Sequence, residues 1–338
     1  MNIKFFQILI CVGLLFFIIS CQSQDKFPEL KGEYLGQTPP GEEAELFAPN
    51  IISNGMSNRD IAITLDGNEI YTVVLVAGYT YTKIIYYKQV NDRWTGPEVA
   101  SVCTGIDYKD GEPFISPDGK KFYFVSNRPD SINGKTDENY DVWAADRIEN
   151  GWSEPYNLGA PVCSETNEFF PSVTNDGTIY FTRGEKNSNE ENIYRSRFVD
   201  GKFQEAEKLS GNVNCGQARF NAFISPDEDY IIVPVYGMPD GYGSTDYYIV
   251  YRNQKDEWSD PINLGDRISS VSDQEWSPYV TRDGKYFFFM SSKLGDTKRY
   301  DPLDYNKILE LNNSPENGNA DIYWIRTSFI EKLRPEGF

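Results

Sequence analysis

The sequence predicts an all-β fold, a β-propeller built from four-stranded blades, and three observations predict it. A short turn centred on an aspartate recurs five times, each time between two apolar and aromatic runs. Third and fourth runs follow most of these turns at similar offsets. Tyr (23) and Phe (21) far outnumber Met (4), and such aromatic enrichment favours strands over helices.

The aspartate turn marks the inner hairpin of each repeat, because Asp-Gly between two apolar runs is a strong hairpin signal. Successive turns are separated by 52, 58, 51 and 56 residues. The fourth copy has Glu228 in place of glycine, so its turn is expected to differ. The five anchors are Asp66, Asp118, Asp176, Asp227 and Asp283.

Two further runs follow the hairpin in most of the repeats. A third run begins at Asp141 with "DVWAADR", and equivalents begin at 192, 246 and 321. A fourth begins at Trp152 with "WSEPYNLGAPV", and equivalents begin at 94, 203 and 258. Four strands in some fifty residues, repeated, are the signature of a propeller blade. Counting therefore gives five blades.

The last repeat shows only three runs and ends with "DIYWIRTSF" from Asp321. Its missing fourth run is supplied by "ELFAPNIIS" at 45–53, which matches "NLGAPVCSE" from Asn157 in pattern. We expect this N-terminal strand to complete the last blade and close the ring. Closure removes exposed strand edges, which otherwise template aggregation.

These motifs resemble the TolB-like (WD40-like) propeller repeats, and the resemblance covers roughly residues 45–328. It implies a propeller, and because members are often six-bladed, six blades is the alternative to the five counted. Such propellers serve many roles, so the resemblance implies little about function. The residues that carry it are Pro113, Ser116 to Gly119, Ser126 to Arg128, Asp141, "GYGSTDYY" at 241–248 and the two "NLG" turns at 157 and 263.

The N-terminus has the features of a secretory leader: Lys4 precedes an apolar run from Phe5 to Ile19, which is short for a membrane span. Ile18-Ile19-Ser20-Cys21 resembles a bacterial lipobox, which implies that Cys21 is lipidated; an ordinary secretory signal is the alternative. We predict a signal peptide at 1–20, a lipidated tether at 21–44 and the propeller at 45–338. A lipid anchor would hold the protein to a cell-envelope membrane, on its periplasmic or surface side, without spanning it.

Composition narrows the possible functions. The net charge of −19 argues against nucleic-acid binding, which depends on Lys and Arg. The chain has no histidine, which excludes a Ser-His-Asp triad and His-ligated zinc. It has no glycine-rich phosphate loop. We expect no cofactor and no metal, and for Cys103, Cys163 and Cys215 we favour buried thiols over a disulfide framework.

Repeat alignment places candidate ligand-binding residues around the mouth of the ring, at the start of each inner strand. Three acids and an arginine stand eight residues before an anchor, and two more acids stand six before one. They could bind a cation, a sugar or a basic side chain, or perform paired-carboxylate chemistry. Alternatively, each acid pairs with backbone or arginine groups between blades. The candidates are Asp110, Glu168, Arg219, Glu275, Asp60 and Glu112.

The longest loop, 294–320, includes "PLDYNKILELNN", which predicts a short helix over the mouth beginning near Pro302. Together these features predict a lipid-anchored envelope protein whose propeller binds a protein partner or a cell-envelope glycan. A carboxylate-dependent glycoside hydrolase or lyase at the mouth is the alternative, but no catalytic residues are assigned.

Overall fold

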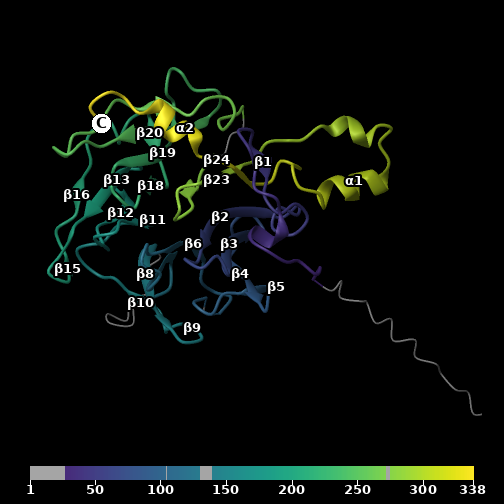
Figure 1. Cartoon of the computed structure of the whole chain (residues 1–338), viewed down its shortest axis with the longest axis horizontal. Coiled ribbons are helices and arrows are strands. Elements are labelled where there is room, and N and C mark those ends of the chain that lie inside the picture. Colours follow the sequence, from purple (N-terminus) through teal and green to yellow (C-terminus); the bar gives the residue numbers. More distant parts are fainter. Residues whose placement is uncertain (1–26, 104, 130–138, 272–274) are drawn as a thin grey trace, which may run out of the picture.

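The computed structural model describes residues 27–103, 105–129, 139–271 and 275–338. Their strands form five antiparallel sheets arranged as blades around a central axis (Figure 1). This confirms the predicted all-β propeller and its five blades. The leader at 1–20 and the lipidation site Cys21 lie outside the described residues.

The blades follow one another along the chain, with the innermost strand of each blade coming first. Blade 1 consists of β2 (Ser57–Ile63), β3 (Glu69–Val76), β4 (Tyr81–Val90) and β5 (Arg93–Val99). Blade 2 consists of β6 (Asp110–Ile115), β7 (Lys121–Ser126), β8 (Asp141–Ile148), β9 (Gly151–Trp152) and β10 (Tyr156–Asn157). Blade 3 consists of β11 (Glu168–Val173), β12 (Ile179–Gly184), β13 (Glu191–Ser196) and β16 (Glu207–Lys208).

Blades 4 and 5 have shorter inner strands. Blade 4 consists of β17 (Ala218–Arg219), β18 (Phe223–Ile224), β19 (Tyr230–Tyr236), β20 (Thr245–Tyr251) and β21 (Ile262–Asn263). Blade 5 consists of β22 (Tyr279–Val280), β23 (Tyr286–Ser291), β24 (Asp321–Arg326) and β1 (Glu45–Leu46). A small hairpin, β14 (Phe198–Val199) with β15 (Lys202–Phe203), projects from blade 3.

The predicted ring closure is confirmed by the pairing of β1 with β24, in which Glu45 lies opposite Trp324 and Leu46 opposite Tyr323. The next residue, Phe47, is fully buried. Its ring centroid lies 5.1 Å from that of Trp324 and 5.0 Å from that of Phe288. An N-terminal strand therefore completes the last blade and stabilises it through both hydrogen bonds and side-chain packing.

The recurring aspartate turns close the inner hairpins as expected. In blade 2, Ser116 Oγ donates to Asp118 Oδ1 at 2.6 Å, and Gly119 has a φ of +71°, which glycine adopts without strain. The fourth turn does differ in its contacts. Glu228 takes the glycine position with a φ of +60°, and Ser225 Oγ donates to Asp229 instead of the anchor Asp227.

The segment 27–44, expected to belong to the tether, runs along the ring. Trp94 donates its backbone N–H to Leu30 at 3.0 Å, and the Tyr34 ring lies 5.2 Å from that of Trp324. The 3-10 helix η1 (Tyr34–Gly36) buries Leu35, and α2 (Ser328–Leu333) buries Ile330 near the C-terminus.

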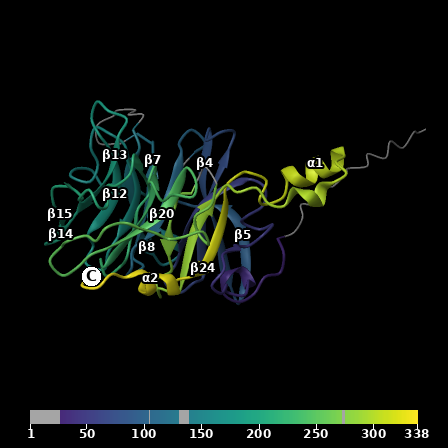
Figure 2. The same cartoon turned by 90° about the horizontal axis from the view of Figure 1, so that it is seen from above.

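The loop after β23 forms an arm that holds η2 (Thr297–Tyr300) and α1 (Tyr305–Asn312). The predicted helix is present, but it does not cover the mouth: both views show the arm extending outward from the edge of the ring (Figures 1 and 2). Among the described residues, no helix is both long and apolar enough to cross a bilayer.

Candidate ligand-binding mouth

The inner strands share an irregularity that fixes where the candidate residues point. Ladder pairing shifts register at Asp60, around Glu112 and around Phe170, and β17 and β18 are separated at Asn221. Residues six before each anchor all have a positive φ, between +42° and +61°. Such a bulge redirects side chains locally. As a result the candidate residues divide into two groups, one at the joints between blades and one on the axis.

Asp110, eight before its anchor, belongs to the first group and is fully buried. One oxygen accepts from Arg128 Nη2 at 2.5 Å and Ser126 Oγ at 2.7 Å. The other accepts from Lys83 Nζ of blade 1 at 2.7 Å. Asp110 therefore joins blades 1 and 2 through a buried ion-pair network.

Glu168 and Arg219 occupy equivalent joints. Glu168 accepts from Arg183 Nε at 2.8 Å and from Ser164 Oγ at 2.5 Å, while burial raises its pKa to about 7. Arg219 donates to the Asn192 side-chain oxygen at 2.8 Å. Both side chains are thus engaged in joints between neighbouring blades.

Glu275 lies at the joint between blades 4 and 5, and its surroundings are poorer in partners. One oxygen accepts from the backbone N–H and the hydroxyl of Ser270, at 2.8 and 2.5 Å. The other oxygen is buried and has no hydrogen-bond partner among the described residues. Burial, with the nearby Asp246 carboxyl adding to it, raises the pKa of Glu275 to about 8.

A second side chain recurs at every joint and bonds the backbone of the third strand. Cys163 Sγ donates to the carbonyl of Val142 at 3.5 Å, and Cys103 Sγ donates to that of Ile84 at 3.7 Å. At the other joints the same place is taken by Asn214, Ser269 and Ser53, which accept from Ile193, Tyr247 and Ile322. Cys103 and Cys163 therefore have a structural role at two of the joints. The three cysteines of the described chain are free thiols of intermediate burial.

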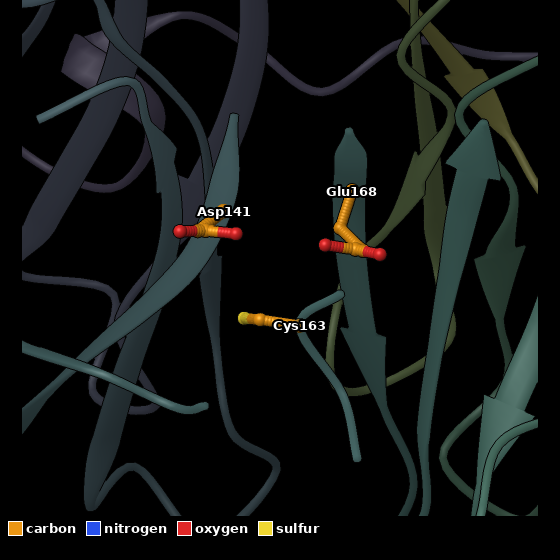
Figure 3. A group of neighbouring side chains, drawn as sticks. All are labelled: Asp141, Cys163 and Glu168. Carbon is orange, nitrogen blue, oxygen red and sulfur yellow. The ribbon is translucent and has the colours of Figure 1, made fainter. Parts of the chain in front are cut away.

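Asp141, Cys163 and Glu168 bring ligand-type atoms within 4.8 Å of one another in the described chain (Figure 3). The chemistry of this set does not suit a cation. Arg183 already places its positive charge on Glu168, and Asn157 donates to Asp141 at 2.9 Å. Burial raises the pKa of the Cys163 thiol well above its usual value, which opposes the thiolate that a metal requires. The cluster is one of the five blade joints.

The second group of candidates lies on the axis, where Asp60 and Glu112 meet across one guanidinium. Arg59 Nε donates to Asp60 Oδ1 at 3.1 Å, and Arg59 Nη2 donates to Glu112 Oε1 at 3.0 Å. Asn221 of blade 4 also donates to Glu112, at 3.0 Å, across the axis. Burial raises the pKa of Glu112 to about 7, with Asp60 contributing and Arg59 opposing the shift.

A pocket of about 260 Å³ opens beside this axial cluster. Arg59, Asp60, Glu112 and Lys109 are the charged residues that line it. Its remaining wall is largely aromatic and aliphatic, contributed by Val73, Leu75, Tyr79, Val125, Tyr140 and Phe169. An apolar pocket with a few convergent polar groups is the usual form of a small-molecule site.

Three aromatic residues at the mouth escaped the sequence analysis. They stand seven residues before an anchor, at Phe169, Phe220 and Trp276, whereas Arg59 and Gly111 occupy this place in blades 1 and 2. The Arg59 guanidinium carbon lies 5.7 Å from the centre of the Trp276 ring, and that ring lies 6.0 Å from the ring of Phe220. The same repeat alignment would have found them, because they are equivalent by position.

The opposite end of the axis, where the aspartate turns lie, is filled by apolar rings. Phe223 lies 6.4 Å from Phe114 and 6.0 Å from Tyr279, measured between ring centres. A cavity of about 850 Å³ lies on this turn face between blades 2 and 3, with Tyr156 and Phe198 in its lining. Apolar rings from blades 2, 4 and 5 therefore pack together at this end of the axis.

Comparison with known proteins supports the fold. No protein-family model and no curated protein matches the chain. Among solved structures it is similar to a putative TolB from Agrobacterium tumefaciens (14% identity, 70% of each chain, TM-score 0.45) and to TolB from Acinetobacter baumannii (14%, 80% of this chain and 57% of that one, 0.43). A glycoside hydrolase matches with 10% identity over 90% of this chain and 94% of the other, TM-score 0.50. The glycoside hydrolase match agrees with the β-propeller that the blades themselves show, and an identity this low concerns the fold alone.

Proposed function

We propose that this chain is a cell-envelope lipoprotein, anchored through Cys21, whose propeller is a binding module with its ligand site at the axial mouth. The observation that carries the site is the meeting of Arg59, Asp60 and Glu112 beside a pocket walled by aromatic rings. The six candidates are not equivalent in this proposal. Asp60 and Glu112 bond neighbouring blades, but they also line the pocket and would contact the ligand. Asp110, Glu168, Arg219 and Glu275 would only hold the blades together.

Of the two ligand classes expected, a saccharide suits the mouth better than a protein. A sugar ring offers an apolar C–H face to aromatic rings and hydroxyl groups to planar donors and acceptors. Phe169 and Tyr140 supply the rings, and their centres lie 5.3 Å apart. Arg59 and Glu112 supply the donors and acceptors. The pocket volume of about 260 Å³ is suited to one ring and is small for a protein surface.

Carboxylate hydrolysis of a glycoside is the second candidate, favoured by the convergence of Asp60 and Glu112 on one pocket. A general acid needs a raised pKa, and burial raises that of Glu112 to about 7. Against it, one guanidinium bonds both carboxyl groups at 3.0 and 3.1 Å. We therefore favour saccharide binding over glycoside hydrolysis as the function of the mouth.

Calorimetric titration with peptidoglycan fragments and a panel of neutral and acidic oligosaccharides tests this proposal. We expect one class to bind the chain from Gln22 onward, and Phe169→Ala to weaken that binding about 3- to 10-fold, as loss of an aromatic contact implies. Glu112→Gln should also weaken it, because the amide cannot accept at both former oxygens. Tyr156→Ala, in the turn-face cavity, is the matched control and should leave affinity unchanged.

The outcomes separate the alternatives. Binding that survives both mouth substitutions would move the site elsewhere on the ring. Reducing ends released from a bound oligosaccharide, and lost in Glu112→Gln, would establish the hydrolase. No saccharide binding, together with capture of an envelope protein that Phe169→Ala abolishes, would assign the mouth to a protein partner.

A further inference from the structure

The arm formed by residues 294–320 carries an apolar face that no other part of the described chain covers. Its helix α1 has no buried residue. Tyr305 is 72% exposed, Ile308 46% and Leu309 42%, and Leu303 just before the helix is 63% exposed. Residues 305, 308 and 309 have the i, i+3, i+4 spacing that places side chains on one face of a helix. Exposing these apolar side chains to water is unfavourable, so we expect the face to contact another molecule or a membrane.

The base of the arm is attached to the ring by specific backbone and side-chain contacts. Leu294 bridges to Asn317 across the base. The side-chain amides of Asn317 and Asn319 both donate to the carbonyl of Gly55, at 3.0 and 2.8 Å. A Cβ atom at Gly55 would lie 2.6 Å from the backbone of Asn313, so the helix end packs directly on this glycine.

The arm projects from the same side of the ring as the beginning of the described chain. Figures 1 and 2 both show α1 and the purple N-terminal segment on one side, with the β14–β15 hairpin on the opposite side. Only six residue steps separate Cys21 from Phe27. Even fully extended, they span about 20 Å. A lipid on Cys21 would therefore bring this side of the ring close to a bilayer.

We propose that the apolar face of the arm inserts into the lipid–water interface and forms a second membrane contact beside the Cys21 anchor. This inference rests on the lipid anchor of the proposed function. Helices that lie in this interface bury their apolar face about 5–10 Å into the boundary between headgroups and acyl chains.

The charge of the arm indicates which lipids it suits. Lys298, Arg299 and Lys307 are outnumbered by Asp296, Asp301, Asp304, Glu310 and Glu316. Attraction to anionic headgroups therefore cannot drive the contact, and burial of apolar surface must. A protein partner is less suited, because specific interfaces bury roughly 800 Å² on each side and this face consists of four side chains.

Quenching of a single added indole by brominated phosphatidylcholine tests the proposal on the full, lipidated chain in vesicles. The probe is Tyr305→Trp on the arm. The matched control is Phe198→Trp, which replaces an exposed aromatic residue on the opposite edge. We expect the protein to float with the vesicles, most of the indole fluorescence added at 305 to be quenched, and that at 198 to persist. Adding Ile308→Ser and Leu309→Ser should abolish the quenching.

Each other outcome has a distinct meaning. Flotation without quenching at 305 overturns the arm contact and leaves the anchor standing. Quenching at both positions overturns it as well, because the ring would then not approach the membrane through this edge. Failure to float overturns the lipid anchor, and with it the inference. A photocrosslinker at Leu309 that joins an envelope protein, with no quenching at 305, assigns the face to a protein instead.

Discussion

Residues at equivalent positions of the five repeats have different bonding partners, as Glu168 and Glu275 illustrate. Both are fully buried eight residues before an anchor, and both accept from a serine. Glu168 also has the guanidinium of Arg183 at 2.8 Å. Near Glu275 the cation is Lys293, whose ammonium instead lies 3.9 Å from Glu316 and over the ring of Tyr323. The charged form of Glu275 is therefore less well stabilised than that of Glu168.

This difference predicts how stability depends on pH. The folded chain keeps the Glu275 proton up to about pH 8, whereas the unfolded chain loses it near its ordinary value of 4.5. Between these values the unfolded state binds fewer protons, so stability falls as pH rises; below 4.5 this loss is absent. Between about pH 5 and pH 8, the free energy of unfolding of Glu275→Gln should fall by roughly 1–4 kcal/mol less than that of the wild type. Urea unfolding at the two pH values measures this difference. Exposed Glu149→Gln should show the wild-type slope.

At the scale of the element, the bulge in the inner strand decides what the mouth displays. Asp60 and Glu112 reach the axis because each stands at a positive φ, +55° in both cases, where the strand alternation is broken. The same conformation at Phe170, Asn221 and Ser277 keeps the ring regular. The bulge thus positions the proposed site, and its backbone geometry restricts which residues the chain tolerates there.

Ser277 offers the cleanest test of that restriction. Its φ is +61°, and its buried hydroxyl has no partner among the described residues. Ser277→Gly should leave stability unchanged or raise it, because glycine adopts a positive φ freely. Ser277→Val should lower the free energy of unfolding by about 1–3 kcal/mol, because a branched Cβ is strained there. Equal losses in guanidinium melts of the two variants would contradict the role given to the bulge.

At the scale of the whole molecule, the ring depends on a strand contributed from the far end of the chain. β1 contributes only Glu45 and Leu46 to blade 5. Much of the closure therefore comes from Phe47, packed between Phe288 and Trp324. Opening this joint would expose the edge of β24 and the apolar faces of blades 1 and 5.

Phe47→Ala measures the strength of the closure. Deleting a fully buried aromatic ring should cost about 3–5 kcal/mol. We expect a lower unfolding midpoint in guanidinium and a tendency to aggregate through the exposed edge. Ile106→Ala, at a residue that is 66% exposed, is the control and should change stability by less than about 0.5 kcal/mol. If Phe47→Ala lowered the free energy of unfolding by as little as the control, the ring would not depend on this strand.

The sequence by itself determined the fold: the hairpin turns, the count of five blades, and the closing strand at 45–53. These are local patterns repeated at a fixed period, and a repeat shows each element several times. It also identified the inner-strand positions. It could not separate Asp60 and Glu112 on the axis from Asp110, Glu168, Arg219 and Glu275 between blades, because a bulge that reverses side-chain direction leaves no distinct residue pattern.

Only the tertiary structure decided the partners and the outline of the molecule. Arg59 bridges Asp60 to Glu112 across two blades. Lys83 reaches Asp110 in the next blade. The arm at 294–320 extends outward although its sequence suggested a cover for the mouth. Contacts of this kind join residues far apart in the chain, and they depend on how blades twist and pack against one another, which strand-forming patterns do not encode.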